Sequence, residues 1–235
     1  MYSDVFCEVY NVFGWNYYPE IFGQQLLQWL RQEKLAPKTA MDLGCGTGVL
    51  CRVLHDSGIQ ASGMDLSQGM ICIAQKENPT LHFEVADMLR FCPIQQFDLV
   101  TCTGDALNHI HALSDIAQVF QNVYADTAPG GVFVFDILND REVSGSEPFE
   151  MDFSDTVRVW FQMTRPDVQQ VNLKIRVYEN GTLSFEENIR ETVHNPAAIC
   201  DLLRQCGFRE IRCTDRLLSE NEPGTTWFII ARKPQ

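Results

Sequence analysis

Three aspartates and a glycine loop are the first residues of the chain that could act together in chemistry. Asp42, Asp65 and Asp87 each stand where a predicted strand ends, and three alternate glycines at 44–48 follow Asp42. Glycines let a backbone approach a ligand where a Cβ would collide. A carboxylate at a strand end can bind both hydroxyls of a ribose, as we expect of Asp65, or an exocyclic amine, as we expect of Asp87. The pattern predicts a nucleoside-binding site.

The residues around the glycine loop narrow the class of ligand. Asp42 would repel a pyrophosphate and suits a ligand with an ammonium group. A dinucleotide fingerprint needs glycine at 49, where the chain has Val49, and the motif G-x-x-x-x-G-K-[ST] is absent. Each aspartate taken alone could instead cap the next helix. Three of them at successive strand ends, together with the glycines, favour the ligand site.

The elements that must position these residues alternate between strand and helix. Short apolar runs predict strands at 40–43, 60–65, 81–85, 97–102, 131–137, 208–213 and 226–231. Amphipathic segments predict helices around 21–30 and at 48–56, 67–77, 113–125 and 197–205. This alternation is typical of an α/β fold, with a Rossmann-like, seven-stranded, mostly parallel sheet and helices on both faces. Such sheets bind ligands at the carboxyl ends of their strands.

The segment 138–194 breaks the alternation and predicts an antiparallel β insertion before the last helix. Apolar and polar residues nearly alternate over 157–163 and again over 171–177, and Asn180-Gly181 predicts a hairpin turn. Val157, Val159, Phe161, Leu173, Ile175 and Val177 are expected on the inward face of the insertion. The opposite face, with Arg158, Trp160, Arg176 and Tyr178, could line an acceptor pocket or form a dimer surface.

Charge and cysteine content exclude several classes of partner. The 235 residues contain 18 Lys and Arg against 31 Asp and Glu, a net charge of −13. Such a surface repels phosphate backbones and anionic lipids, so we expect no nucleic-acid and no membrane partner. Nine cysteines without a C-x-x-C pair predict reduced thiols and no metal site. With no basic leader or long apolar run, a cytoplasmic location is expected.

At its motifs the chain resembles the class I S-adenosylmethionine-dependent methyltransferases. The resemblance covers roughly residues 38–137 and rests on the segments Asp42–Gly48, Asp65–Met70, Ala86–Met88, Phe97–Val100 and Pro129–Val134. It implies that the glycine loop contacts the methionine part of the cofactor, that Asp65 binds the ribose, and that Asp87 and the Met88 backbone bind the adenine. It further implies that S-adenosylmethionine leaves as S-adenosylhomocysteine.

The candidate cofactor-binding residues combine these motifs with two N-terminal tyrosines and the loop after the fourth strand. They are Tyr10, Tyr18, Asp42, Gly44, Cys45, Gly46, Gly48, Asp65, Leu66, Met70, Asp87, Met88, Thr103 and Gly104.

Methyl transfer by such a cofactor needs alignment of the acceptor more than dedicated catalytic groups, because the sulfonium is already electrophilic. A protonated acceptor still needs a base. Asp105, Asn108 and His109 are the acceptor-side candidates, and His109 is favoured as the base because its ordinary pKa lies nearest neutrality. The alternative is a surface or capping histidine.

The acceptor is expected to be a small molecule that is methylated on N or O. The second half resembles a subgroup that includes sugar N-methyltransferases, although Asn11 replaces the aspartate of that subgroup's Tyr-Asp pair at Tyr10. The loop at 103–105 lacks the Pro-Pro-aromatic motif of nucleic-acid amino methyltransferases. A non-catalytic S-adenosylmethionine-binding or regulatory module and a nicotinamide oxidoreductase are the alternatives.

Four parts of the chain follow from this interpretation. They are an N-terminal helical lid at 1–36, the cofactor-binding core at 37–137, the antiparallel cap at 138–194, and the completion of the core at 195–235. Aromatic residues crowd 2–18, where they could close over the cofactor or simply anchor a helix. A monomer or a homodimer is expected.

Overall fold

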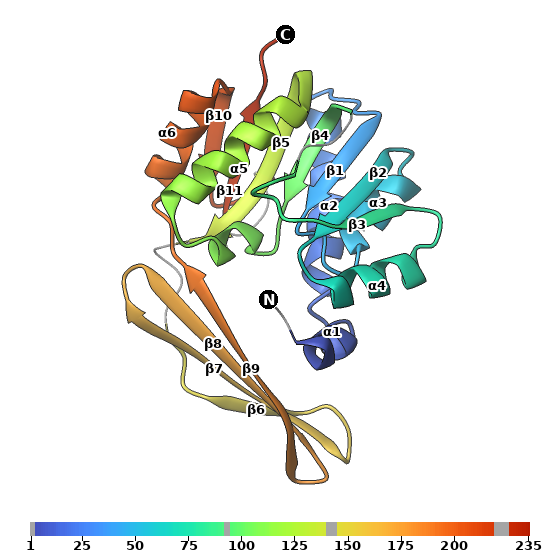
Figure 1. Ribbon diagram of the computed structural model, residues 1–235, viewed down its shortest axis with the longest axis vertical. Coiled ribbons are helices and arrows are strands. Elements are labelled where there is room, and N and C mark those ends of the chain that lie inside the picture. The colour runs from blue at the N-terminus through green and yellow to red at the C-terminus, as the bar shows by residue number, and fades with distance from the viewer. Residues whose placement is uncertain (1–2, 92–94, 140–144, 219–225) are drawn as a thin grey trace.

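The computed structural model describes residues 3–91, 95–139, 145–218 and 226–235, and these form a sheet body with a smaller sheet extending from it (Figure 1). The larger sheet has seven strands in the order β10-β11-β5-β4-β1-β2-β3. Strands β1 to β5 pair in parallel, whereas β11 pairs antiparallel with both β5 and β10. Its strands are β1 Thr39–Leu43, β2 Gln60–Asp65, β3 His82–Val85, β4 Phe97–Cys102, β5 Thr127–Leu138, β10 Arg209–Thr214 and β11 Thr226–Arg232. The predicted seven-stranded α/β fold is confirmed.

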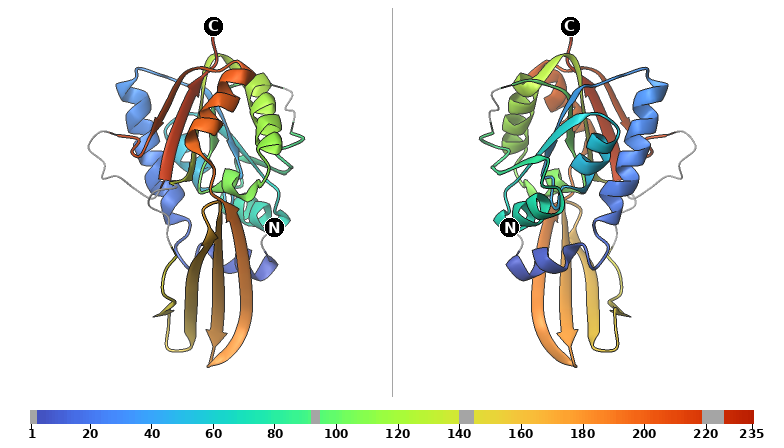
Figure 2. Two further views of the ribbon diagram at one scale, coloured as in Figure 1. Left: turned by 90° about the vertical axis from the view of Figure 1, so that its left-hand side faces the viewer. Right: turned by 90° about the vertical axis from the view of Figure 1, so that its right-hand side faces the viewer.

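Helices cover both faces of this sheet (Figure 2). Helices α2, α3 and α4 contribute buried side chains to the core on one face, and α5 and α6 contribute to the core on the other. The helices are α1 Asp4–Tyr10, α2 Tyr17–Gln32, α3 Val49–Asp56, α4 Gln68–Glu77, α5 Leu113–Asp126 and α6 Pro196–Cys206. A single helical turn, Ala106–His109, follows β4.

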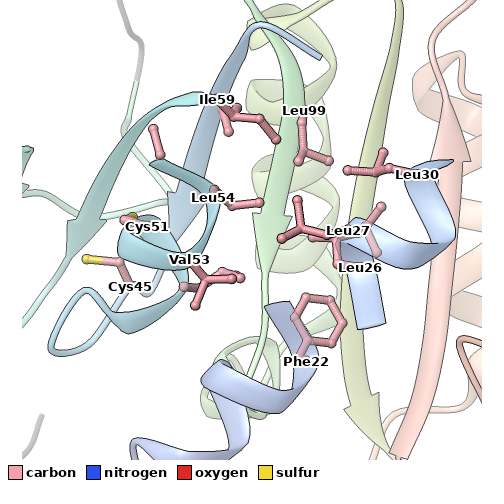
Figure 3. Close-up of a cluster of buried hydrophobic side chains, with 14 of the residues drawn as sticks. Phe22, Leu26, Leu27, Leu30, Cys45, Cys51, Val53, Leu54, Ile59 and Leu99 are labelled. Carbon is pink, nitrogen blue, oxygen red and sulfur yellow. The ribbon is translucent and has the colours of Figure 1, made fainter. Parts of the chain in front are cut away.

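Strand β5 explains why the sheet must be covered on both faces. Phe133 and Phe135 point into the core with α5, while Val132 and Val134 point into the core with α2. All four are at most 3% exposed, because successive side chains of a strand face opposite sides. Figure 3 shows the α2 side, where side chains of α2 and α3 pack over β4.

Local sequence signals set the ends of several helices. The Asn195 side chain accepts hydrogen bonds from the backbone of Ala197 and Ala198, with Pro196 in the first turn of α6. Gly207 ends α6 with a φ of 109°. Ser67 begins α4 by accepting from the Met70 amide. The expected beginning and end of the last helix are therefore confirmed.

The smaller sheet is the predicted antiparallel insertion, and it projects beyond the carboxyl end of β5 (Figure 1). Asn180 and Gly181 form its hairpin turn with φ values of 51° and 78°. Its strands are β6 Phe149–Asp152, β7 Val157–Asp167, β8 Gln170–Glu179 and β9 Thr182–Thr192. We call β6–β9 the cap sheet.

One face of the cap sheet is covered by the N-terminal segment. Val159, Ile175 and Val177 are at most 2% exposed and share a cluster with Phe6 and the Trp15 ring. The inward face expected from the alternation is thus confirmed. On the other face, the guanidinium of Arg176 lies 4.8 Å from the centre of the Trp160 ring.

The segment 1–36 is not uniform in its packing. Helix α2 lies on the sheet body, where Phe22, Leu26 and Leu30 are buried in the core. Helix α1 instead contacts the cap sheet and α4. A lid role for 1–36, like the division into four parts, stays a prediction.

No helix in the described part of the chain is long and apolar enough to cross a membrane.

Candidate active site

A cavity of about 640 Å³ opens where β1, β2 and β3 end. The cap sheet reaches it through residues 187–190 of β9, and α1 reaches it through Tyr10. Most of the predicted site residues line it: Tyr10, Asp42, Gly44, Cys45, Gly46, Asp65, Leu66, Met70, Asp87, Met88, Thr103, Gly104 and His109. Tyr18, Gly48, Asp105 and Asn108 do not line it.

The glycine loop folds tightly around three left-handed residues. Gly44, Gly46 and Gly48 have φ values of 68°, 52° and 80°, which side chains other than glycine rarely adopt. A Cβ at Gly48 would lie 2.6 Å from the Phe83 ring, and one at Gly44 would lie 2.8 Å from Ala106. A Cβ at Gly46 would meet no atom within 4 Å. Gly44 and Gly48 therefore serve packing, and Gly46 keeps the cavity open.

Asp65 is held at the cavity wall by the loop beside it. Its Oδ2 accepts a hydrogen bond of 3.0 Å from the Gly46 amide, and its Oδ1 accepts one of 2.8 Å from the Ser67 amide. Burial raises the pKa of this carboxyl above its ordinary value. The lone pairs left over are available to a pair of hydroxyls, as a ribose presents.

Asp42 and Asp87 lie on either side of Asp65 along the sheet edge. Asp42 is 3% exposed and accepts a hydrogen bond of 2.7 Å from the Thr101 hydroxyl. Burial raises its pKa to about 7. Asp87 accepts a hydrogen bond of 2.9 Å from the Leu89 amide, which fixes the loop after β3. A cationic ligand beside Asp42 would favour its ionised form.

His109 lies at the cavity wall beside Glu191 of the cap sheet. The His109 Nε2 and Glu191 Oε1 atoms are 3.8 Å apart. Burial lowers the pKa of His109 to about 4 and raises that of Glu191 to about 7. An ion pair would shift both values in the opposite directions, so burial dominates and the imidazole is neutral at pH 7. A neutral imidazole can accept a proton.

Asn108, another acceptor-side candidate, binds main-chain groups. It is fully buried, its Nδ2 donates to the Thr192 carbonyl at 2.7 Å, and its Oδ1 accepts from the Leu138 amide at 3.1 Å. These bonds hold the two chain segments that join the cap sheet to the body. A role for Asn108 toward the acceptor stays a prediction.

Asp136 is a buried site residue that the sequence motifs did not indicate. It is 0% exposed near the end of β5, and it accepts hydrogen bonds from the Tyr18 hydroxyl and from the Gly104 and Asp105 amides. The one available signal was an aspartate inside an otherwise apolar run, 132–138. Glu187, from β9, was also missed, because only the fold brings β9 to the cavity.

The N-terminal segment closes one side of the cavity by polar bonds as well as aromatic packing. Asn11 accepts a hydrogen bond from Thr47 of the glycine loop at 2.8 Å. Ser3 donates from its amide to Glu187 at 3.2 Å, which ties the segment to the cap sheet. Burial raises the pKa of Tyr10 to about 12, so its hydroxyl stays protonated. Tyr2 lies outside the described residues.

Comparison with known proteins identifies similar methyltransferases. Residues 40–131 match a family described as a methyltransferase domain. The putative methyltransferase YqeM of Bacillus subtilis (strain 168) is 25% identical over 200 residues, 81% of each chain. A dTDP-3-amino-3,6-dideoxy-alpha-D-glucopyranose N,N-dimethyltransferase of Streptomyces fradiae is 28% identical over 137 residues, 57% of this chain and 53% of that protein.

A solved structure has the same fold over the full length. SAM-bound CalS10, an amino pentose methyltransferase from Micromonospora echinaspora, superposes with a TM-score of 0.77 at 20% identity and covers 99% of this chain and 98% of its own. The fold and the glycine loop with its acidic strand ends thus define a Rossmann-like methyltransferase.

The chain is similar to the class I S-adenosylmethionine-dependent methyltransferases, and S-adenosylmethionine is its cofactor. The residues present fit that cofactor. Gly46 leaves the loop open, Asp65 offers free lone pairs, and Asp42 places an acidic group beside a ligand that carries an ammonium and a sulfonium.

Proposed function

We propose that the enzyme methylates an amino nitrogen of a small molecule bound between His109 and strand β9. The cofactor supplies an electrophilic methyl group on a sulfonium. The part of the cavity beyond the glycine loop is lined by His109, Asp115, and residues 187–190 of β9. Asp115 and Glu187 favour an acceptor with a basic nitrogen, because each can pair with a cation.

The proposal rests on the position of His109 at the cavity wall, where burial lowers the pKa of its imidazole to about 4. Bound S-adenosylmethionine would supply the methyl group to the nitrogen lone pair and would leave as S-adenosylhomocysteine. His109 takes the proton that the amine loses, and the carboxyl of Glu191, 3.8 Å away, lies close enough to stabilise the resulting imidazolium. The dTDP-amino sugar relative of Streptomyces fradiae, named as an N,N-dimethyltransferase, supports an amine acceptor.

A panel of matched acceptors tests the proposal. Each pair shares one skeleton, and one member carries an amine where the other carries a hydroxyl; amino sugars and their parent sugars, free and as dTDP conjugates, form the first set. With S-adenosylmethionine labelled on its methyl group, we expect label on the amines. Label on the hydroxyl members alone would overturn the assignment to nitrogen, and binding of the cofactor without transfer to any acceptor would favour a regulatory module.

We also propose a cytoplasmic location and no nucleic-acid partner. None of the eight cysteines that the structure describes forms a disulfide, which suits a reducing compartment. The net charge of −13 supports the second statement. Size-exclusion chromatography with light scattering distinguishes a monomer from a homodimer.

A further inference from the structure

We propose that Asp136 is a positioning residue for methyl transfer, and that it fixes the Gly104–Asp105 turn that forms part of the cofactor and acceptor wall. Gly104 lines the cavity, whereas Asp136 does not, so Asp136 acts through the turn. The proposal needs cofactor binding only and does not depend on which acceptor the enzyme uses.

The Gly104–Asp105 turn has an unusual backbone that needs support. Gly104 has a φ of 71° and Asp105 a φ of 61°, and the second value is costly for a residue with a Cβ. Both amides point to one carboxylate: Gly104 donates to Asp136 Oδ2 at 3.1 Å, and Asp105 donates to Oδ1 at 3.0 Å. Two successive amides turned to the same side form a site for an anion. The carboxylate of Asp136 therefore holds the turn in its left-handed form.

A third donor links the same carboxylate to the N-terminal half of the chain. The Tyr18 hydroxyl, at the start of α2, donates to Asp136 Oδ2 at 2.5 Å. Tyr18 is 36% exposed, yet its hydroxyl is turned inward and its pKa is raised by burial and by Asp136. Asp136 thus joins β5, the turn after β4 and the beginning of α2 at a single point. This explains why Tyr18 bears on the site without lining the cavity.

Burial of a carboxylate in a sheet needs a reason, because an apolar residue would pack there without cost. The neighbours on the same face of β5 are Val132 and Val134, both in the apolar core. Burial raises the pKa of Asp136, and its three hydrogen-bond donors counter only part of that shift. Burial, followed by the neighbouring Asp136, raises the pKa of Asp105 well above its ordinary value. Asp136 is the member of this pair that accepts the hydrogen bonds from Tyr18, Gly104 and Asp105.

The test is the variant Asp136→Asn, which replaces one carboxylate oxygen by an NH₂ group and keeps the shape of the side chain. In Asp136→Asn the Nδ2 group cannot accept from a backbone amide, so one amide of the turn loses its partner. We expect hydrogen exchange at the Gly104 and Asp105 amides, followed by nuclear magnetic resonance, to quicken by about tenfold or more, with exchange in β1 and β4 unchanged. We expect calorimetry to show roughly tenfold weaker binding of S-adenosylhomocysteine. Asp126→Asn, a buried aspartate at the end of α5 away from the cavity, is the matched control and is expected to change neither quantity.

A second variant keeps the carboxylate. Tyr18→Phe removes one donor and is expected to weaken S-adenosylhomocysteine binding by about threefold, whereas Tyr17→Phe, at an exposed neighbour, is expected to leave it unchanged. The proposal is overturned if exchange at the turn in Asp136→Asn matches that of Asp126→Asn, or if all amides quicken together. It is also overturned if S-adenosylhomocysteine binds Asp136→Asn as tightly as the wild type.

Discussion

Thr47 of the glycine loop donates a hydrogen bond of 2.8 Å from its hydroxyl to Oδ1 of Asn11, and this bond joins the N-terminal segment to the cofactor site. The same Asn11 side chain donates from Nδ2 to the two carboxylate oxygens of Glu77, at 3.0 and 3.1 Å. The amide of Asn11 can accept from a hydroxyl through its oxygen and donate to a carboxylate through its nitrogen, whereas an ionised aspartate can only accept. The asparagine that departs from the Tyr-Asp pair of the sugar N-methyltransferases thus matches its surroundings in this chain.

Replacement of Asn11 by aspartate is expected to loosen the N-terminal segment. Asn11→Asp loses the bond to Glu77 and sets two carboxylates against each other, so S-adenosylhomocysteine should bind about three- to tenfold more weakly by calorimetry. High salt should restore part of the loss, because it screens exposed charges. Asn16→Asp makes the same change in charge five residues along, where the side chain caps no helix. Equal affinities in the two variants would contradict the role of Asn11.

Replacement of Trp15 tests whether the aromatic packing of the segment matters to the site. The Trp15 ring lies 4.9 Å from Phe6 and 5.9 Å from Phe161 between ring centres, so it joins α1 to the cap sheet. Trp15→Ala is expected to expose residues 3–16 to limited proteolysis and to weaken cofactor binding. Trp160→Ala, on the other face of the cap sheet, is the control. If Trp15→Ala bound the cofactor as tightly as the wild type, the N-terminal segment would contribute only to packing.

His109→Gln is expected to lower kcat by about 10²- to 10⁴-fold with an acceptor from the panel, and to change the affinity for S-adenosylhomocysteine by less than about threefold. Because burial lowers the pKa of His109 to about 4, the wild-type base is available across pH 5–8. The kcat profile should therefore show no loss of this base near pH 6.5. His55→Gln on α3 should behave as the wild type, and full activity in His109→Gln would rule the base out.

The pH dependence of stability follows from buried acids such as Asp42. A pKa raised to about 7 means that the folded state binds the proton more tightly, so the free energy of unfolding falls as pH rises from near 4 through 7. Between pH 5 and pH 8 this group alone should remove about 2 to 3 kcal/mol. Asp42→Asn keeps an acceptor for Thr101 and should lose that part of the dependence in urea titrations without ligand. The control Asp56→Asn, at an exposed residue at the end of α3, should keep the pH dependence of the wild type. If the free energy of unfolding of Asp42→Asn fell with pH as steeply as that of the wild type, Asp42 would not be its source.

Features encoded by neighbouring residues could be predicted from the sequence. The glycines at 44–48 and the Asn180-Gly181 turn both demand positive φ values, so their residue types reveal the geometry. The strand-end aspartates lie at one edge because parallel strands share their direction. The positions of strands and helices could be predicted from apolar periodicity, because each element has its own local pattern of apolar residues.

Features that need two distant segments could not be predicted. Asp136 meets the amide of Gly104 only because β5 pairs beside β4, and no local pattern records that pairing. The main-chain partners of Asn108, the Thr192 carbonyl and the Leu138 amide, depend on the path of the chain at both ends of the cap sheet. The contribution of β9 to the cavity likewise depends on where the cap sheet sits.

Calorimetric titration of S-adenosylhomocysteine into the wild type and Asp65→Ala tests whether the cavity at the ends of β1, β2 and β3 binds the cofactor. We expect one site per chain in the wild type and about 100-fold weaker binding in the variant, because Asp65 lines the cavity and holds the Gly46 amide. Asp167→Ala, in the cap sheet away from the cavity, should bind as the wild type. No binding to the wild type, or equal binding to Asp65→Ala, would rule out this cavity as the cofactor site.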